Sequence, residues 1–577
     1  MTRSAGAEAP AAASDRLRAL LFCGAVAWMV WPLWSTRFLP IEDLPQHLAA
    51  VRVLHDFHDA RYAFEQYFEL SLGRTQYLAY YLIVHVLAYV LDLELANRVV
   101  MIACAAATPY ALAYLLGALG KERALALFAL PLTYNAHLIL GFINFLMAIP
   151  AALWGLGLCV RQREAPQRWR AGLLACVATF CFFCHVVPFA FLLLGAALLS
   201  MSRDVRRMAL RFLPLVPSLL IGGLWLAQSP AGHATLTAAQ GGGAGPQAQY
   251  QPAAFALRDL PNWLTDVLHG PEGLQLLRGY LSLLALALLL GLIKLAFTRP
   301  WQRLEQRLAH QAGTVRQEEV HADGVAARVD GVAARSGGAD TRADEGVRAV
   351  TRFARALVPG VECASLAAGR RSALACLLPL APLAAAAYFV SPAGYDWIWP
   401  IAQRFPLLAL YFVVPVLPTP PRAATLLIAL ALLGLSIRQQ ILVQRAFSAF
   451  EREEVGDLEG ALAAIPEGRR VCGLIWSRGS RHVKFSPFIH AVAYYQARKG
   501  GAVMFTFADF PPSPFRFRED NRPPRVPPRW EWLPQRVRHA DLQWYEYALV
   551  RGGPDPCRGR CDLRYQDGMW SVWQLRK

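Results

Sequence analysis

Charged residues are scarce in this chain, and acidic residues are the scarcer kind. Asp, Glu, Lys and Arg make up 17% of its 577 residues, whereas soluble proteins average about 25%. This composition excludes an intrinsically disordered chain and a coiled coil, and it argues against an ordinary soluble enzyme. The 11 cysteines are too few for a small disulfide scaffold. Most of them lie in apolar runs, where a thiol packs as a small apolar group.

Several catalytic signatures are also absent. The chain contains no GxxxxGK[ST] motif, which excludes a P-loop ATPase, and neither an HExxH zinc motif nor a GxSxG nucleophile elbow. The net charge is +17, but much of the excess lies in short loops between apolar runs. No basic motif is interleaved with aromatic residues, so we do not expect nucleic acid as a partner.

Apolar residues are abundant instead, at 55% of the chain, and they form runs of nearly bilayer length. Such runs predict an α-helical protein that crosses a membrane several times. The expected fold class is a membrane all-α bundle of about 11–13 spans with a small external C-terminal α/β domain. We expect it in the bacterial inner membrane, in contact with membrane lipids.

Basic loops predict the topology, because positive residues stay on the cytoplasmic side. Only about thirty residues separate the basic clusters at 161–170 and 203–211, which is short for two spans. We therefore expect two shortened helices that meet near His185. Residues 77–117 hold two apolar segments where the flanking charges require an odd number of crossings, so one segment is expected to be re-entrant or interfacial. The predicted division is a cytoplasmic N-terminus (1–16), a transmembrane bundle (17–443) with periplasmic loops (37–76 and 228–272) and a flexible cytoplasmic insertion (299–371), and a periplasmic α/β domain (444–577).

The C-terminal segment has a different pattern. Short apolar runs predict strands, and one longer run predicts a helix, which together are typical of a small α/β domain. Cys557 and Cys561 lie in its polar part and can pair if the domain is periplasmic. The predicted strands are 471–476, 503–507, 544–550 and 570–575, and the predicted helix is 486–499.

The segment IEDLPQH follows the first apolar run directly. Its carboxylates, Glu42 and Asp43, are functional candidates because acidic groups at the lip of a membrane cavity are costly unless they are solvated or used. His47 lies about one helical turn after Asp43. Asp43 would then act as a general base or metal ligand with His47 as its partner. The alternative is that Asp43 only caps a helix that begins near Pro45.

A metal site is a further alternative. Asp43 and His47, together with His55 and His58, would serve a metal-dependent phosphotransferase, since HxxH spacing on a helix places both rings on one side. Residues 51–68 also match an amphipathic helix on the membrane surface. No cofactor is required by the function that we favour, and a divalent metal ion remains the alternative.

Four polar residues stand in strongly apolar surroundings, at positions predicted near the external face. Each of them alone is more often structural, but together they bring several helices to one place. Arg offers a permanent charge and a bidentate fork, which suits a phosphate group. The predicted substrate-binding residues are His137, Asn144, His185 and Arg404.

This layout resembles the GT-C superfamily of membrane glycosyltransferases, which includes protein O-mannosyltransferases and lipid A aminoarabinose transferases. The resemblance covers about residues 17–440 at the level of architecture. It is carried by the first span, by IEDLPQH in a long external loop, and by a helix-rich bundle followed by an external domain. The order Glu42-Asp43 reverses the usual Asp-Glu order of the superfamily, and its Lys-Pro-Pro element is missing where GRTQYLAYYL stands.

The resemblance implies transfer of a sugar from a polyprenyl-phosphate donor to a periplasmic acceptor, which is a glycan, a lipid or a protein. It implies that Asp43, with Glu42 as the rival, is the catalytic base or a metal ligand. It also implies that basic residues hold the donor phosphate, for which Arg404 and His185 are the candidates. The alternative function is a non-enzymatic transporter of envelope lipids or glycans, or a membrane scaffold.

Overall fold

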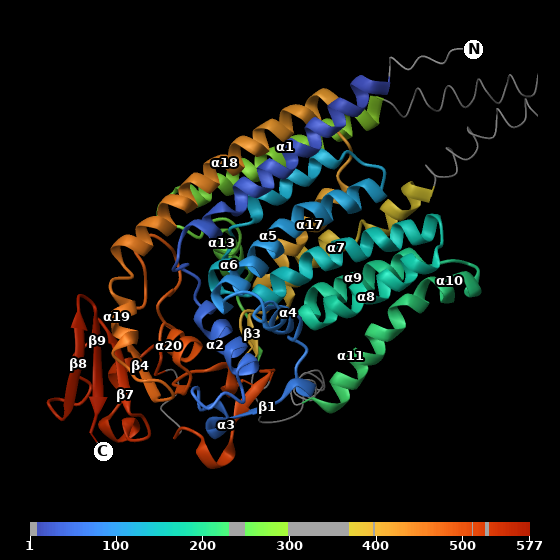
Figure 1. The fold of residues 1–577 in the computed structure, drawn as a ribbon. Helices are drawn as coiled ribbons and strands as arrows, with labels where there is room; N and C mark the ends of the chain where they lie inside the picture. Colours follow the sequence, from blue (N-terminus) through green and yellow to red (C-terminus); the bar gives the residue numbers. More distant parts are fainter. Residues whose placement is uncertain are drawn as a thin grey trace, which may run out of the picture.

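The computed structural model describes residues 8–229, 248–297, 369–395, 398–510, 512–524 and 530–576. The predicted insertion at 299–371 lies outside the described residues except for its last three, which belong to a helix. The molecule is an elongated bundle of helices with a mixed sheet at one end (Figure 1).

Long apolar helices dominate the described part of the chain, which identifies it as a membrane protein. Seven described helices are long and apolar enough to cross a bilayer. The predicted number of 11–13 spans stays a prediction. The seven helices are Arg16–Ser35, Leu93–Ala118, Ile143–Glu164, Val205–Gln228, Glu272–Phe297, Gly369–Val390 and Arg422–Glu453, and shorter apolar helices are Arg123–Leu132, Val186–Ser200 and Ala402–Val416.

The centre of the bundle is α7 (Ile143–Glu164), whose most apolar window is 89% buried inside the protein. It packs against α5 (Leu93–Ala118), α8 (Arg168–Cys184) and α9 (Val186–Ser200). The small residues Ala148, Ala151 and Ala152 are buried on α7, which is typical of close packing between membrane helices.

The structure confirms that two shortened helices meet near His185, whereas the re-entrant or interfacial placement of a segment in 77–117 stays a prediction. In 77–117, α4 (Ala79–Leu87) has only nine residues, and a helix of that length spans about 13 Å of a bilayer core that is about 30 Å thick. Only α5 of that pair is long enough to cross. Helices α8 and α9 meet at His185, the single non-helical residue between them.

The other labelled elements of the bundle and of the loops around it include both long helices and short segments. They are α1 (Glu8–Ser35), α2 (Leu44–His55), α3 (Phe64–Tyr67), β1 (Phe68–Leu70), η1 (Leu72–Arg74), η2 (Arg123–Leu132), α6 (Ala136–Leu140), α10 (Val205–Phe212), η3 (Leu213–Leu215), α11 (Val216–Gln228), β2 (Ala248–Gln249), α13 (Ala253–Trp263), α16 (Leu380–Val390), β3 (Gly394–Tyr395), η4 (Ala402–Arg404), α17 (Phe405–Val416) and α18 (Arg422–Glu453).

The C-terminal domain contains the predicted sheet. Its five strands have the order β5-β4-β7-β9-β8, in which β4 is parallel to β5 and β7, and β9 is antiparallel to β7 and β8. Its elements are α19 (Leu458–Ala463), β4 (Arg470–Ile475), α20 (Ala493–Lys499), β5 (Ala502–Val503), η5 (Phe507–Asp509), β6 (Phe515–Phe517), η6 (Glu519–Asn521), η7 (Pro534–Arg536), η8 (His539–Leu542), β7 (Tyr547–Arg551), β8 (Cys561–Asp567) and β9 (Trp570–Leu575).

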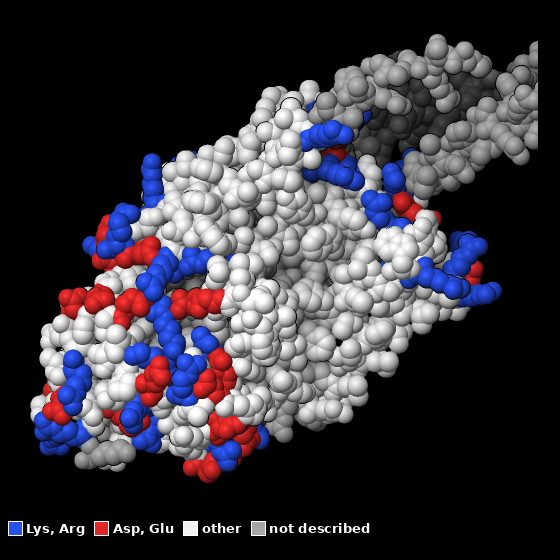
Figure 2. All heavy atoms as spheres, in the orientation of Figure 1, with Lys and Arg blue, Asp and Glu red and all other residues white. Residues whose placement is uncertain are grey.

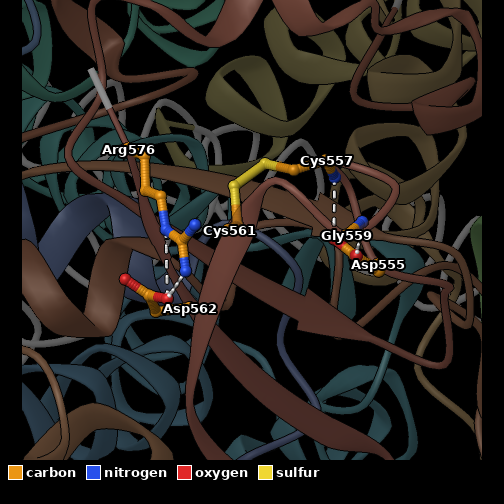
Figure 3. Close-up of a disulfide and its surroundings, with 6 residues drawn as sticks. All are labelled: Asp555, Cys557, Gly559, Cys561, Asp562 and Arg576. Atoms are coloured by element: carbon orange, nitrogen blue, oxygen red, sulfur yellow. Dashed lines mark hydrogen bonds and ion pairs between the residues drawn. A yellow bond between two sulfur atoms is a disulfide. The ribbon is translucent and has the colours of Figure 1, made fainter.

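Three details of this domain differ from the prediction. The strand predicted over 503–507 is reduced to the two residues of β5, because β4 pairs only with Ala502 and Val503. The helix predicted over 486–499 forms only at its C-terminal half, because residues 486–492 turn over the loop that follows α1. Strand β8 was not predicted, because it is a largely polar edge strand that is defined by pairing with β9. The predicted pairing of Cys557 with Cys561 is confirmed, and the disulfide closes the turn before β8 (Figure 3).

The first loop, residues 37–76, packs against the C-terminal domain. Strand β1 of the loop pairs antiparallel with β6, so that Phe68 lies opposite Phe517. Helix α2 packs against α4 and α20 and is buried along most of its length. The predicted amphipathic surface helix over 51–68 is therefore wrong, because α2 ends at His55 and the C-terminal domain covers it.

Charge is concentrated at the two ends of the molecule. Figure 2 shows a broad region almost free of charge between a mainly basic end and an end of mixed charge that includes the C-terminal domain. Short loops meet at the basic end, where Arg370 pairs with Glu164 at 3.2 Å and Arg422 lies 3.9 Å from Glu122. This distribution matches a protein that is embedded in a bilayer.

Candidate functional site

The acidic loop, residues 36–43 between α1 and α2, lies against the turn that follows α6. The backbone N–H of Glu42 donates to the carbonyl of Ile139 at 2.8 Å, and that of Asp43 donates to the carbonyl of Leu140 at 3.1 Å. Gly141 has a φ of +91°, which favours glycine. A Cβ atom at Gly141 would lie 2.8 Å from the Cβ of Asp43. The turn therefore holds Asp43 at contact distance.

Replacing Gly141 with alanine should disturb this contact. The new Cβ would strain the backbone and press on Asp43, so we expect a loss of about 1–3 kcal/mol of stability. Thermal unfolding in detergent measures the effect. Gly172→Ala is the matched control, because no atom lies within 4 Å of a Cβ built there. Equal melting temperatures for the two variants would contradict the close approach.

The carboxylate of Asp43 does not cap α2. Asp43 occupies the N-cap position, but its side chain accepts no hydrogen bond from the helix. Its Oδ1 instead lies 3.3 Å from Nε2 of His490 in the C-terminal domain. The capping alternative therefore does not describe this carboxylate, which is directed at another ionisable group.

His47 is not the partner of Asp43. Its Nε2 donates to the carbonyl of Gly141 at 2.8 Å, and its Nδ1 lies 3.0 Å from the hydroxyl of Tyr81. His47 points into the protein because α2 begins at Leu44 and its buried face packs on the bundle. Since both ring nitrogens are engaged, His47 fastens α2 to the 139–141 turn and has no free nitrogen for a proton or a metal.

Glu42 is buried beside Asp43. Its Oε2 accepts a hydrogen bond of 2.9 Å from the backbone N–H of Ser486. Burial raises the pKa of Glu42 to about 7, and the charge of Asp43 adds to the effect. A carboxyl group with such a pKa gains and loses its proton near neutral pH.

His490 is a site residue that sequence reasoning missed. Burial disfavours its cation, but the hydrogen bond and the charge of Asp43 outweigh this effect and raise the pKa of His490 above its ordinary value. No local pattern marks His490, which lies in an apolar segment far along the chain from Asp43. Only the packing of the C-terminal domain on the acidic loop brings the two together.

A second group of polar residues surrounds Phe142 and Phe145. The rings of His137 and His185 lie 4.9 and 5.3 Å from the ring of Phe145. The guanidinium of Arg404 lies 5.4 Å from the ring of Phe142. The structure therefore brings three of the predicted substrate-binding residues together, and Asn144 stands beside Phe145 in the first turn of α7. We call His137, Asn144, His185, Gln403 and Arg404 the cationic cluster.

Every member of the cationic cluster has at least one buried polar atom without a partner among the described residues. Nδ1 of His185 accepts from the N–H of Val187, so its Nε2 carries the proton of the neutral ring and is a free donor. A buried donor or acceptor without a partner costs about 1–3 kcal/mol. The buried atoms without a partner are His137 Nδ1, Asn144 Oδ1, His185 Nε2, both amide atoms of Gln403, and Arg404 Nε.

The acidic loop and the cationic cluster lie next to each other. Asp43 contacts Gly141. Phe142, the residue after Gly141, packs its ring against the guanidinium of Arg404. No carboxylate pairs with Arg404 in the described part of the chain. The site thus joins a carboxylate pair, through the turn at 141–142, to a group of polar side chains whose donors are of the kind that hold an oxyanion.

The predicted metal ligands, Asp43, His47, His55 and His58, do not form a common cluster. The described residues contain no group of three or more His, Cys, Asp or Glu side chains that could hold a metal ion. His55 is the last residue of α2 and contacts His85, whereas His58 lies beyond the helix and pairs with Glu65. The HxxH pair therefore does not share a helix face.

Comparisons with known proteins give no identity. No protein-family model matches the chain, and no curated protein matches its sequence. The function is therefore argued from the residues of the site.

Proposed function

We propose that this protein is a membrane glycosyltransferase that moves a sugar from a polyprenyl-phosphate donor to an acceptor on the external face of the membrane. The observation that carries the proposal is the contact between the two parts of the site. Asp43 contacts the turn at Gly141, and the next residue, Phe142, packs against Arg404, a buried arginine that has no carboxylate partner among the described residues. Such a transfer needs a base for the acceptor and positive charge for the leaving phosphate.

In this proposal each part of the site has one task. Asp43 removes the proton of an acceptor hydroxyl or amine, and the resulting nucleophile attacks the anomeric carbon of the sugar. The bond from that carbon to the phosphate oxygen breaks, and its electron pair leaves with polyprenyl phosphate. Arg404 and the N–H of His185 stabilise the charge that grows on this phosphate. The chain's apolar helices offer a membrane setting for the polyprenyl tail.

The proposed orientation places the site in the bacterial periplasm. The basic end of the bundle would face the cytoplasm, because positive residues are retained there. The disulfide Cys557–Cys561 supports an oxidising compartment for the opposite end. In this orientation the C-terminal domain and the acidic loop are periplasmic, where lipid-linked sugars meet envelope acceptors.

Asp43→Asn should abolish transfer while the fold is kept, because asparagine retains the shape of aspartate but cannot take a proton. Membrane vesicles from cells that express the protein contain their own polyprenyl-phosphate sugars and envelope acceptors. Mass spectrometry follows the depletion of this lipid pool over time. We expect the rate to fall by about 10²–10⁴-fold, the usual contribution of a general base.

Asp59→Asn is the matched control, because Asp59 lies in the same external loop and pairs with Arg61 at 2.8 Å, away from the site. It should deplete the pool as the wild type does. Undiminished depletion by Asp43→Asn would contradict the role of Asp43 as base. A lipid-linked sugar that binds both proteins but is never consumed would instead favour a transporter or scaffold.

A further inference from the structure

The segment 477–492 of the C-terminal domain covers the acidic loop. It connects β4 with α20, and Ser486 within it donates its backbone N–H to Glu42. Phe485, the preceding residue, has a φ of +73°, which is unusual for a residue with a side chain. Phe488 stacks on Phe450 of α18 at 4.9 Å and lies under the guanidinium of Arg551 at 3.5 Å. The segment is thus held firmly between α18 and β7.

This packing fixes the orientation of His490. Its Nε2 lies 3.3 Å from Oδ1 of Asp43, and the side chain is 18% exposed. Its Nδ1 is buried and has no partner among the described residues. The charges that act on His490 come from Asp43 and Glu42 in the acidic loop and from Glu531 in the C-terminal domain. An ionised Asp43 accepts a hydrogen bond from Nε2, so the neutral ring presents a lone pair at Nδ1.

We infer that His490 and Asp43 act as a dyad in which Nδ1 of His490 takes the proton of the acceptor and Asp43 orients the ring. The inference rests on the proposed function and moves the role of base from Asp43 to His490, with Asp43 as the residue that orients it. It also makes the C-terminal domain a part of the catalytic site, which neither the acidic loop nor the bundle completes alone.

The proton and electron pairs balance in this step. The acceptor loses its proton to Nδ1 of His490, and its lone pair forms the new bond to the anomeric carbon. The electron pair of the broken carbon–oxygen bond leaves on the phosphate of the polyprenyl carrier. The imidazolium is stabilised by the negative charge of Asp43 until it returns the proton to water or to the released phosphate. No oxidant or further reactant is needed.

The dyad explains two features of the site together. Asp43 caps no helix, and among the described residues its carboxylate forms an ion pair with His490 alone. The unpartnered Nδ1 of His490 would cost about 1–3 kcal/mol in a purely structural role. An acceptor hydroxyl at Nδ1 would satisfy that atom. The acceptor would then bind between the acidic loop and segment 477–492.

His490→Gln tests the inference in the same membrane vesicles, with depletion of the endogenous polyprenyl-phosphate sugars as the readout. Glutamine keeps an amide N–H that can reach Asp43 but has no basic nitrogen. We expect a loss of about 10²–10⁴-fold in rate, similar to that of Asp43→Asn. His482→Gln is the matched control, because His482 lies in the same domain and pairs with Glu453 at 3.0 Å, away from Asp43.

Added imidazole separates a catalytic role from a structural one. It should restore part of the activity of His490→Ala and leave Asp43→Asn inactive. Normal depletion by His490→Gln together with an inactive Asp43→Asn would overturn the dyad and leave Asp43 as the base. Activity in both variants would overturn the proposed function itself. An inactive His490→Ala with a lowered melting temperature and no rescue would show that His490 is structural.

Discussion

Arg404→Met should stabilise the ligand-free protein and abolish its retention of polyprenyl-phosphate lipids. The residue is only 8% exposed, and its Nε has no partner among the described residues. Keeping a charge away from water is costly unless it is paired, and replacing buried charges with apolar side chains of similar volume often gains about 1–4 kcal/mol. Methionine fills the space without a charge. The melting temperature should therefore rise while the phosphate loses its main ligand.

The two effects are measured separately. Thermal unfolding in detergent, after removal of bound lipid, reports the stability, and native mass spectrometry reports the lipids that co-purify. If a substitution raises the melting temperature and removes lipid binding, the original residue serves function at a cost in stability. Retention of the same phosphorylated lipids by Arg404→Met would remove the support for the phosphate site.

Arg551→Met is the matched control for Arg404→Met. Arg551 is also buried, but its guanidinium donates to the carbonyls of Ser477 and Glu454 and covers the ring of Phe488. Its replacement leaves two carbonyls without their donor, so the melting temperature should fall. A fall of the same size in Arg404→Met would show that Arg404 serves the fold and not a ligand.

The free energy of unfolding of the wild type should fall as the pH rises, because Glu42 loses its proton. Glu42→Gln should not show this fall. Glu42 has an ordinary pKa of 4.5 when the chain is unfolded and a pKa of about 7 in the folded protein. Between these values the folded state binds a proton that the unfolded state does not, so the free energy of unfolding falls as the pH rises through this window. The full loss is about 3 kcal/mol, because one pKa unit corresponds to about 1.4 kcal/mol.

The comparison is made between melting temperatures at pH 5 and pH 8. Glutamine stays neutral and can still accept the hydrogen bond from Ser486 through its amide oxygen. The variant should match the wild type closely at pH 5 and exceed it at pH 8. Because groups remote from the site titrate equally in both proteins, the difference comes from Glu42 and its coupling to Asp43 and His490. An equal pH dependence of the two proteins would contradict a buried carboxyl at this position.

Local patterns predicted much of the membrane part. Apolar runs mark helices by length and composition alone, so the first span and α5 were within reach of the sequence. The short distance between two basic clusters predicted the break at His185, because too few residues remained for two full spans. The acidic segment and every member of the cationic cluster except Gln403 also stood out, since polar groups are rare in such surroundings.

The partners of these residues were not predictable. Asp43 and His47 are one turn apart in sequence, yet His47 turns inward to Gly141 and Tyr81, while Asp43 faces His490. Helical spacing predicts which side chains lie on the same face of a helix. It does not predict which face is buried against the rest of the protein. Strand β1 was not predicted either. A segment of three residues forms a strand only when a partner such as β6 supplies the hydrogen bonds.

Local composition was enough to identify a membrane protein, the basic end of its bundle and the positions of its rare polar groups, because hydrophobicity and charge act locally. The joining of segments hundreds of residues apart into one site came from the packing of the whole chain. The C-terminal domain had to pack on the acidic loop before His490 met Asp43, and the turn at Gly141 had to form before Asp43 lay against the segment that contacts Arg404. Such contacts arise from the burial of whole surfaces against each other, which no local pattern records.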